Sequence, residues 1–392
     1  MAKVQGTAED RFAEIYKLFQ GFLDSGDEVG ASIAVDVDGK TVLDYWGGYA
    51  DQARSRKWEK DTIVNVWSTS KTATSLAALV AIDRGLLDPY EKVAKYWPEF
   101  AANGKENVQV RHLLSHASGL SGWQEPVTFA DVCNVEKSTK LLEQQAPWWE
   151  PGTASGYHAQ TMGHLVGGLI SRVTGKSLKQ FIAEDLAEPL GADFQLGAKE
   201  EDWPRVADII PPPPMDLANL PKSFEDPDSL TSRTLTNPPM DANTANTEEW
   251  RRGEVGAANG HSNARAVAKL LSAISLGGTV NGTKLLSPET IELIFKEQQK
   301  GLDLVLGQVF RLGIGFGLTG QDTEFKWLPD GRVCTWGGWG GSIVIMDLDR
   351  RLTISYAMNK MENAGLGNAR TKEYVKAIYK VFGVEDSAVP VI

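Results

Sequence analysis

The sequence predicts an α/β (α+β) fold, with an antiparallel sheet flanked by helices and an inserted, mainly helical domain. β-rich runs lie near both ends of the chain, within residues 31–46 and 310–358, whereas the segment between them carries helical patterns of apolar residues. A sheet assembled from both ends encloses whatever is inserted between them. We therefore expect residues 1–90 and 300–392 to form the sheet domain and residues 91–299 to form the helical domain, with any functional site at their interface.

Length and charge limit the function classes. The chain has 392 residues, of which 42% are hydrophobic, enough for a large core in one bilobed unit or two domains. Its 40 basic and 51 acidic residues give a net charge of −11, which disfavours binding to nucleic acid or anionic lipid. Because no stretch has the apolar length of a membrane span and no apolar signal core precedes the first helix, we expect a cytoplasmic protein with no membrane partner. The oligomeric state stays open.

The metal-binding residue types show no ligand pattern. Cys133 and Cys334 lie far apart in the sequence and are expected to be free thiols. The histidines, which are His112, His116, His158, His164 and His261, form no His-Glu-x-x-His or comparable motif. We expect neither a metal nor a cofactor.

The N-terminal part predicts a helix followed by a hairpin. Apolar residues recur at helical spacing at Phe12, Ile15, Leu18, Phe19 and Phe22. Residues 31–37 and 41–46 are typical of strands, and the Asp-Gly pair at 38–39 favours the positive φ values of a tight turn between them. This hairpin starts the antiparallel sheet.

The middle of the chain predicts helices and one irregular segment. Helical patterns lie at residues 110–114, 162–173 and 264–276. Residues 204–250 show no periodic element and are rich in proline, aspartate, asparagine and threonine. This segment is either a lid or cleft wall, or a solvated surface insertion.

The last hundred residues return to strands and end in a helix. The expected strands cover residues 310–318, 333–336, 342–347 and 352–358, with a turn at Asp349 and Arg350 between the last two. A closing helix is expected at residues 369–382, because apolar residues recur there at helical spacing.

A Ser-x-x-Lys motif stands at a strand-to-helix transition. The extended run at residues 63–67 gives way to an Ala/Leu-rich helix that stops at Gly85, so Ser68 falls in the first turn of that helix. Helix residues three apart share a face, which brings the Lys71 amine beside the Ser68 hydroxyl. The unpaired N–H groups of a helix start favour negative charge. A hydroxyl, a base and oriented donors are what acyl transfer requires; the alternative is that Ser68 only caps the helix.

Two further segments complete a family pattern. Residues 151–159 read Pro-Gly-Thr-Ala-Ser-Gly-Tyr-His-Ala, and residues 335–342 read Thr-Trp-Gly-Gly-Trp-Gly-Gly-Ser. With Ser68, Lys71 and Tyr157, the chain resembles the serine β-lactamase and penicillin-binding-protein family. It is most similar to the class C branch and to the β-lactamase-like carboxylesterases, the family VIII esterases. The resemblance runs from the first hairpin to the last helix and implies a β-lactamase-like fold.

The resemblance implies a role for each of these residues. Ser68 would attack an ester or amide carbonyl and form an acyl-enzyme, with Lys71 and Tyr157 as the acid–base pair. Lys71 can serve as a base only if burial lowers its pKa toward neutrality, and a hydrogen bond from Lys71 would shift the Tyr157 phenol toward phenolate. Which of the two takes the first proton stays open. The backbone N–H groups of Ser68 and Trp339 would form the oxyanion hole.

The chain departs from the lactamase pattern at two positions. Trp336 stands where the family has the lysine of Lys-Thr-Gly, and an indole cannot pair with the carboxylate of a β-lactam. Ala159 replaces the asparagine of Tyr-x-Asn. Both changes favour neutral, hydrophobic acyl groups. The expected substrate contacts are Trp336, Gly338, Trp123 and His158. Trp148 and Trp149 either extend this wall or belong to the core.

We therefore predict a serine carboxylesterase acting on a small-molecule ester. The alternatives are an acyltransferase on the same scaffold, then a β-lactamase or D-alanyl peptidase, then a non-catalytic binding module. A Ser-His-Asp triad using His116 or His158 is disfavoured, because the chain has no Gly-x-Ser-x-Gly elbow. His112 and His116 are expected to stabilise their loop through hydrogen bonds.

Overall fold

A computed structural model describes residues 2–214, 222–239 and 241–384 of the chain. Met1 and residues 385–392, which the sequence assigned to the sheet domain, lie outside the described residues. So do residues 215–221 and 240, which belong to the segment expected to be irregular.

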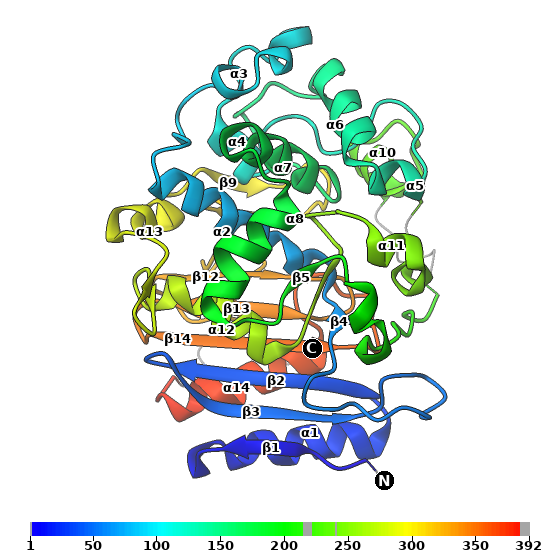
Figure 1. The fold of residues 1–392 in the computed structure, drawn as a ribbon, viewed down its shortest axis with the longest axis vertical. Helices are drawn as coiled ribbons and strands as arrows, with labels where there is room; N and C mark the ends of the chain where they lie inside the picture. Colours follow the sequence, from blue (N-terminus) through cyan, green and yellow to red (C-terminus); the bar gives the residue numbers. More distant parts are fainter. Residues whose placement is uncertain (1, 215–221, 240, 385–392) are drawn as a thin grey trace.

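A nine-stranded antiparallel sheet crosses the molecule (Figure 1). Its spatial order is β1-β3-β2-β14-β13-β12-β11-β10-β9. The strands are β1 (Gln5–Ala8), β2 (Gly30–Val37), β3 (Lys40–Gly48), β9 (Gln299–Leu302), β10 (Val309–Leu312), β11 (Gly317–Leu318), β12 (Val333–Gly337), β13 (Ile343–Asp347) and β14 (Leu352–Met358). The first and last strand groups join where β2 pairs with β14. The predicted sheet from both ends of the chain is confirmed.

Turn chemistry explains most strand boundaries. The expected hairpin forms between β2 and β3, and Asp38 and Gly39 have the positive φ values of 51° and 76° that such a turn needs. The single strand expected at 310–318 is wrong: Leu312 pairs with Gly317 across a tight turn, so β10 and β11 are separate strands. Gly315 within that turn has a φ of 86°. Strands β1 and β9 had not been predicted.

Helices cover both faces of the sheet. α14 (Ala369–Val381) packs with α1 (Ala13–Ser25), and its Tyr374 ring lies 5.4 Å from that of Tyr356 in β14. α12 (Ala264–Ser275) lies against the other face, where Ser275 bonds Thr353 of the same strand at 2.7 Å. Thr353 and Tyr356 are three positions apart and so point to opposite faces. The two helix groups therefore sandwich the sheet.

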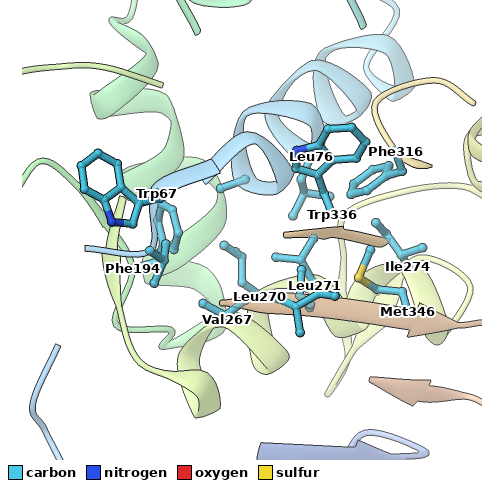
Figure 2. Close-up of a cluster of buried hydrophobic side chains, with 14 of the residues drawn as sticks. Trp67, Leu76, Phe194, Val267, Leu270, Leu271, Ile274, Phe316, Trp336 and Met346 are labelled. Atoms are coloured by element: carbon cyan, nitrogen blue, oxygen red, sulfur yellow. The ribbon is translucent and has the colours of Figure 1, made fainter. Parts of the chain in front are cut away.

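The helix that carries the Ser-x-x-Lys motif runs through the middle of the protein. α2 (Ser70–Asp83) packs against α7 (Thr161–Thr174) and α12, and its side chains are buried almost throughout. Figure 2 shows the core beside it, where Leu76 of α2, Leu271 of α12 and Trp336 of β12 lie close together. The start of α2 is thereby held against the sheet.

Shorter elements complete the fold. The remaining helices are α3 (Val93–Tyr96), α4 (Val110–Leu114), α5 (Phe129–Cys133), α6 (Val135–Gln144), α8 (Leu178–Phe181), α9 (Glu188–Leu190), α10 (Leu230–Leu235), α11 (Glu248–Arg252) and α13 (Pro288–Phe295). A small sheet has the order β4-β6-β5, and β7 pairs with β8. Their bounds are β4 (Val64–Asn65), β5 (Gln195–Leu196), β6 (Gly260–Ser262), β7 (Thr279–Val280) and β8 (Thr283–Lys284). α12 falls within the expected helical domain but packs on the sheet.

The segment at 204–250 is more regular than expected. It contains α10 and α11, which are capped by the side chains of Ser229 and Thr247. The prediction that this segment has no regular element is therefore wrong at these two helices. The sequence did not reveal them, because helices of five or six residues are too short to show a hydrophobic period.

The described residues include no helix with the length and apolar character needed to cross a bilayer. Nor do they contain a group of three or more His, Cys, Asp or Glu side chains that could hold a metal ion. Cys133 and Cys334 are free thiols, as predicted, and burial raises the pKa of both.

Candidate active site

Ser68 lies in a tight turn that leads directly into α2. A 3-10 turn, Trp67–Thr69, precedes the helix and is closed by the Thr69 N–H, which donates to Val66 O at 3.1 Å. Ser68 therefore sits just before α2 rather than inside its first turn. Trp67 has a φ of 47°, a left-handed conformation that is unusual for a bulky residue. Strained backbone of this kind occurs preferentially at functional sites.

Lys71 lies beside the Ser68 hydroxyl, as the helical spacing predicted. Its Nζ is 3.1 Å from Ser68 Oγ, 2.7 Å from Ala159 O and 2.9 Å from Ala257 O. The residue is 1% exposed, and all three partners are uncharged. Burial lowers the pKa of Lys71 well below the ordinary lysine value. The condition that the sequence set for a lysine base is met.

Tyr157 reaches the same hydroxyl from the other side. Its Oη donates to Ser68 Oγ at 2.6 Å, and Lys71 Nζ lies 4.8 Å from the centre of its ring. Burial raises the pKa of Tyr157 to about 12, although the Ser68 hydroxyl acts in the opposite direction. The expected shift toward phenolate is therefore wrong, because desolvation outweighs the hydrogen bonds that favour the phenolate. The phenol is protonated at neutral pH.

Asp303, which the sequence analysis did not single out, holds Tyr157 in place. Its Oδ1 accepts the backbone N–H of Tyr157 at 3.0 Å, that of Val305 at 3.0 Å and that of Leu306 at 2.9 Å. The carboxylate is buried in the loop after β9. No motif surrounds Asp303 in the sequence, so only the long-range contact with Tyr157 identifies it.

The glycine-rich run at 337–341 lies against Ser68. A Cβ on Gly338 would come within 3.2 Å of the Ser68 nitrogen and 2.3 Å of Val66 O, so only glycine fits this close approach. Ser342 fastens the run, since its hydroxyl donates to Val66 O at 2.9 Å. Elements from both ends of the chain meet at Ser68.

The two expected oxyanion donors lie on the facing segments. The Ser68 amide belongs to the helix-entry turn, where N–H groups lack an intrahelical acceptor. Within the described residues the Trp339 N–H donates to no backbone or side-chain acceptor. The Trp339 ring is half-buried and lies 5.2 Å from that of Trp67.

The four residues expected to contact the substrate lie in different places: Trp336 and Gly338 lie beside Tyr157 and Ser68, whereas Trp123 and His158 lie in the core. Trp336 is buried, and its ring centre lies 5.7 Å from that of Tyr157 and 5.5 Å from that of His116. Trp336 therefore packs against the rings of Tyr157 and His116. Gly338 lies next to Ser68, as described above.

Two of the expected substrate contacts are core residues instead. Trp123 is 2% exposed, and its indole N–H donates to Ser138 O at 3.1 Å. His158 is fully buried, with Nδ1 2.6 Å from Gly156 O and Nε2 2.6 Å from the Ser118 hydroxyl. Burial lowers the pKa of His158 to about 4, so its ring is neutral. Neither side chain presents surface to a substrate.

The other histidines near the site have structural contacts. His116 Nδ1 accepts the His158 N–H at 3.1 Å, and burial lowers the pKa of His116 well below its ordinary value. His112 Nδ1 accepts the Gln109 N–H at 3.2 Å and caps α4. The predicted hydrogen-bonding role of both is confirmed.

The adjacent tryptophans lie in different settings. The Trp149 indole donates to Ala154 O at 3.0 Å and packs against Gly156, so it supports the loop that carries Tyr157. The Trp148 ring lies 3.9 Å from the guanidinium carbon of Arg233. Both tryptophans are half-buried.

Sequence comparisons point to one family. The model of the family described as Beta-lactamase matches residues 15–377. Esterase/beta-lactamase LipL from Mycobacterium tuberculosis is 33% identical over 350 residues, which cover 83% of this chain and 80% of LipL.

Solved structures agree with this relationship. A family VIII carboxylesterase superposes with a TM-score of 0.89 at 37% identity, covering 97% of this chain and 100% of the other. A penicillin-binding protein homologue from Caulobacter crescentus gives 0.87 at 34% identity, with coverage of 97% and 100%. EstCE1, described as a hydrolase with promiscuous acyltransferase activity, gives 0.70 at 21% identity, covering 95% of this chain and 98% of EstCE1, which shows the shared fold alone.

Proposed function

Because this chain belongs to the beta-lactamase family and is a carboxylesterase-type serine hydrolase, we propose that it cleaves neutral, hydrophobic small-molecule esters through an acyl-enzyme on Ser68. One observation carries the proposal. Ser68 Oγ lies within hydrogen-bond distance of both Lys71 Nζ and Tyr157 Oη, and Lys71 is buried with no carboxylate partner among the described residues. A nucleophile flanked by a base and an acid is the arrangement that acyl transfer needs.

Lys71 is the base for the first step. A neutral amine has two N–H groups and one lone pair, and the carbonyls of Ala159 and Ala257 can accept both N–H groups. The lone pair is then free for the Ser68 proton. As Ser68 Oγ bonds to the ester carbonyl carbon, its proton passes to Lys71, and the carbonyl oxygen becomes an oxyanion stabilised by the amides of Ser68 and Trp339.

Tyr157 serves the leaving group. With a pKa of about 12 the phenol holds its proton, so it can donate to the departing alkoxide as the ester C–O bond breaks. Lys71 then returns its proton to Tyr157, and both groups regain their starting state. Water then resolves the acyl-enzyme: it loses a proton to the Lys71–Tyr157 pair as its oxygen bonds to the acyl carbon. The pair returns that proton to Ser68 Oγ as the bond between Ser68 Oγ and the acyl carbon breaks, and the carboxylic acid is released.

The position of Trp336 supports the preference for neutral esters. An indole replaces the family lysine, and its ring packs with Phe310 and Phe325 at centroid distances of 6.0 Å and 6.1 Å. This apolar cluster cannot neutralise a substrate carboxylate. Burying an uncharged acyl group beside it costs much less free energy than burying a charged one.

Labelling and substrate comparison test the proposal. A fluorophosphonate should modify wild-type protein at Ser68, and Ser68→Ala should abolish both labelling and hydrolysis of a p-nitrophenyl ester. The ester should be turned over much faster than a chromogenic cephalosporin. Labelling elsewhere in well-folded protein would refute the nucleophile, faster cephalosporin turnover would indicate a lactamase, and turnover that requires an added alcohol would indicate an acyltransferase.

A further inference from the structure

The loop at 338–341 contains the peptide that carries the Trp339 N–H. Gly340 and Gly341 have φ values of 98° and 124°, in the region that favours glycine. Glycine backbone is also the easiest to rotate, so these residues alone would not keep the neighbouring Trp339 amide in one orientation. Within the loop the Gly341 N–H donates to Gly338 O at 3.1 Å, and Gly338 O belongs to the peptide that carries the Trp339 N–H. The orientation of that amide therefore depends on what holds Gly340 and Gly341 in place.

The first turn of α14 supplies that support. The Asn368 side-chain amide donates to Gly340 O at 3.1 Å, and the Thr371 hydroxyl donates to Gly341 O at 2.8 Å. The two side chains also bond to each other, and Asn368 caps α14 by accepting the Thr371 N–H at 2.9 Å. Both are buried, and a Cβ on Gly341 would lie 2.2 Å from Asn368 Nδ2. The helix end and the loop are in close contact.

A second segment, at residues 360–364, also holds the loop. The Gly340 N–H donates to Ala364 O at 2.8 Å, and the Glu362 N–H donates to Gly340 O at 3.2 Å. Arg370 links this segment to α14, since its Nη2 donates to Lys360 O at 2.9 Å and its Nε lies 3.4 Å from Glu362 Oε1. The carbonyl of Gly340 is thus bonded from two directions.

We propose that Asn368 and Thr371 are positioning residues for the oxyanion hole. Their side chains, at the start of α14, hold the carbonyls of Gly340 and Gly341. As a result, the adjacent Trp339 N–H stays free and directed toward Ser68. This inference rests on the proposed function and assigns to residues remote from Ser68 a part in transition-state stabilisation. They act through the loop and touch no reacting atom.

Three substitutions separate positioning from folding. Asn368→Asp keeps the oxygen that caps α14 but removes the donor to Gly340, and Thr371→Val keeps the shape but removes the hydroxyl. Thr371→Ser retains the hydroxyl and is the conservative rescue. Asn134→Asp is the control for the same substitution at an exposed helix cap, because Asn134 caps α6 through the Lys137 N–H.

Two inhibitors distinguish stabilisation of the oxyanion from binding of an uncharged, planar ligand. Phenylboronic acid adds to a serine hydroxyl as a tetrahedral species with an oxygen in the oxyanion position, whereas benzamide stays planar and uncharged. With rates normalised to titrated active sites, Asn368→Asp and Thr371→Val should lower kcat/KM for a p-nitrophenyl ester about 10- to 100-fold. The Ki of phenylboronic acid should rise by the same factor, and the Ki of benzamide should stay constant.

The outcomes identify which idea fails. Thr371→Ser and Asn134→Asp should match wild type within about twofold, which is the expectation for changes that leave the donors in place. Unchanged kcat/KM in Asn368→Asp and Thr371→Val would overturn the positioning role, and equal losses for both inhibitors would assign these residues to general site integrity instead. If Ser68→Ala kept full esterase activity, the proposed function itself would fall.

Discussion

The indole rings of Trp67 and Trp339 lie 5.2 Å apart, so the residue before Ser68 contacts the residue that carries the second expected oxyanion donor. Trp67 also packs against Trp250 at 5.9 Å and is almost fully buried. This aromatic contact joins the helix-entry turn to the loop between β12 and β13.

Replacing Trp67 should separate the ring contact from the backbone strain. Trp67→Ala and Trp67→Gly both remove the buried ring, which typically costs about 3–5 kcal/mol of unfolding free energy. Only glycine also relieves the positive φ, so Trp67→Gly should be more stable than Trp67→Ala by about 1 kcal/mol. Urea unfolding of the two variants measures the difference. Equal or greater stability of the alanine variant would mean that Trp67 is unstrained.

Lys71 should control the acid limb of the pH profile. Protonation at low pH removes the base, so activity should fall as the pH drops below the lowered pKa of Lys71. Lys71→Met should lower kcat/KM by about 10²- to 10⁴-fold. Lys71→Arg should fail as badly, because a guanidinium does not deprotonate.

Lys105 provides the control for that experiment. It is likewise buried, and its amine donates to two carbonyls, Ala102 O and Gln145 O. Unlike Lys71, it forms no hydrogen bond to a hydroxyl among the described residues. Burial lowers the pKa of Lys105 to about 8. Lys105→Met should leave the acid limb of kcat/KM in place. A shifted limb in this variant would show that the limb reports folding rather than the base.

Tyr157 should matter most for poor leaving groups. An alkyl alcohol needs a proton as it departs, whereas p-nitrophenolate leaves readily as an anion. Tyr157→Phe should therefore slow hydrolysis of an alkyl ester by about 10²- to 10⁴-fold, and that of the p-nitrophenyl ester of the same acid much less. Equal losses for both esters would assign Tyr157 to positioning of Ser68. Because the pKa of Tyr157 is about 12, wild-type activity should show no alkaline limb from this phenol between neutral pH and about pH 10.

The sequence predicted Ser68, Lys71 and Tyr157, the proposed reacting residues, because their relationship is local or belongs to a motif. Ser68 and Lys71 meet through helical spacing, and the hairpin turn follows from the Asp-Gly pair at its tip. The sequence did not predict the direction in which side chains point. Trp123 and His158 lie on segments next to the site, yet both side chains point into the core. Composition and spacing carry no information on that choice.

The supporting residues were missed for a related reason. Asp303, Asn368 and Thr371 bond to backbone groups of distant segments, at Tyr157, Gly340 and Gly341. A backbone N–H or carbonyl is present at every residue, so the sequence gives no sign of which one a side chain will bind. Only the packing of α14 and of the β9–β10 loop creates these pairs.

Glu28 should make the stability of the protein depend on pH near neutrality. Its carboxyl is buried, Tyr356 Oη donates to its Oε2 at 2.5 Å, and Arg370 Nε lies 3.8 Å from the same oxygen. Burial raises the pKa of Glu28 to about 7, against the opposing influence of Arg370, whereas the unfolded chain has the ordinary value of 4.5. The folded state therefore binds a proton more tightly than the unfolded state. The resulting stabilisation is fully present below about pH 4.5 and is lost as the pH rises through about 7, with a total on the order of 3 kcal/mol.

Glu28→Gln should remove that dependence, because glutamine keeps the shape of the protonated carboxyl and does not ionise. Between about pH 5 and pH 8, unfolding free energies from urea titrations should fall with pH in wild type and fall less steeply in the variant. The variant should be the more stable protein at the upper end of the range, since it avoids a buried charge. Parallel curves for the two proteins would mean that Arg370 holds Glu28 ionised throughout, and that the buried pair rather than a shared proton stabilises this side of α14.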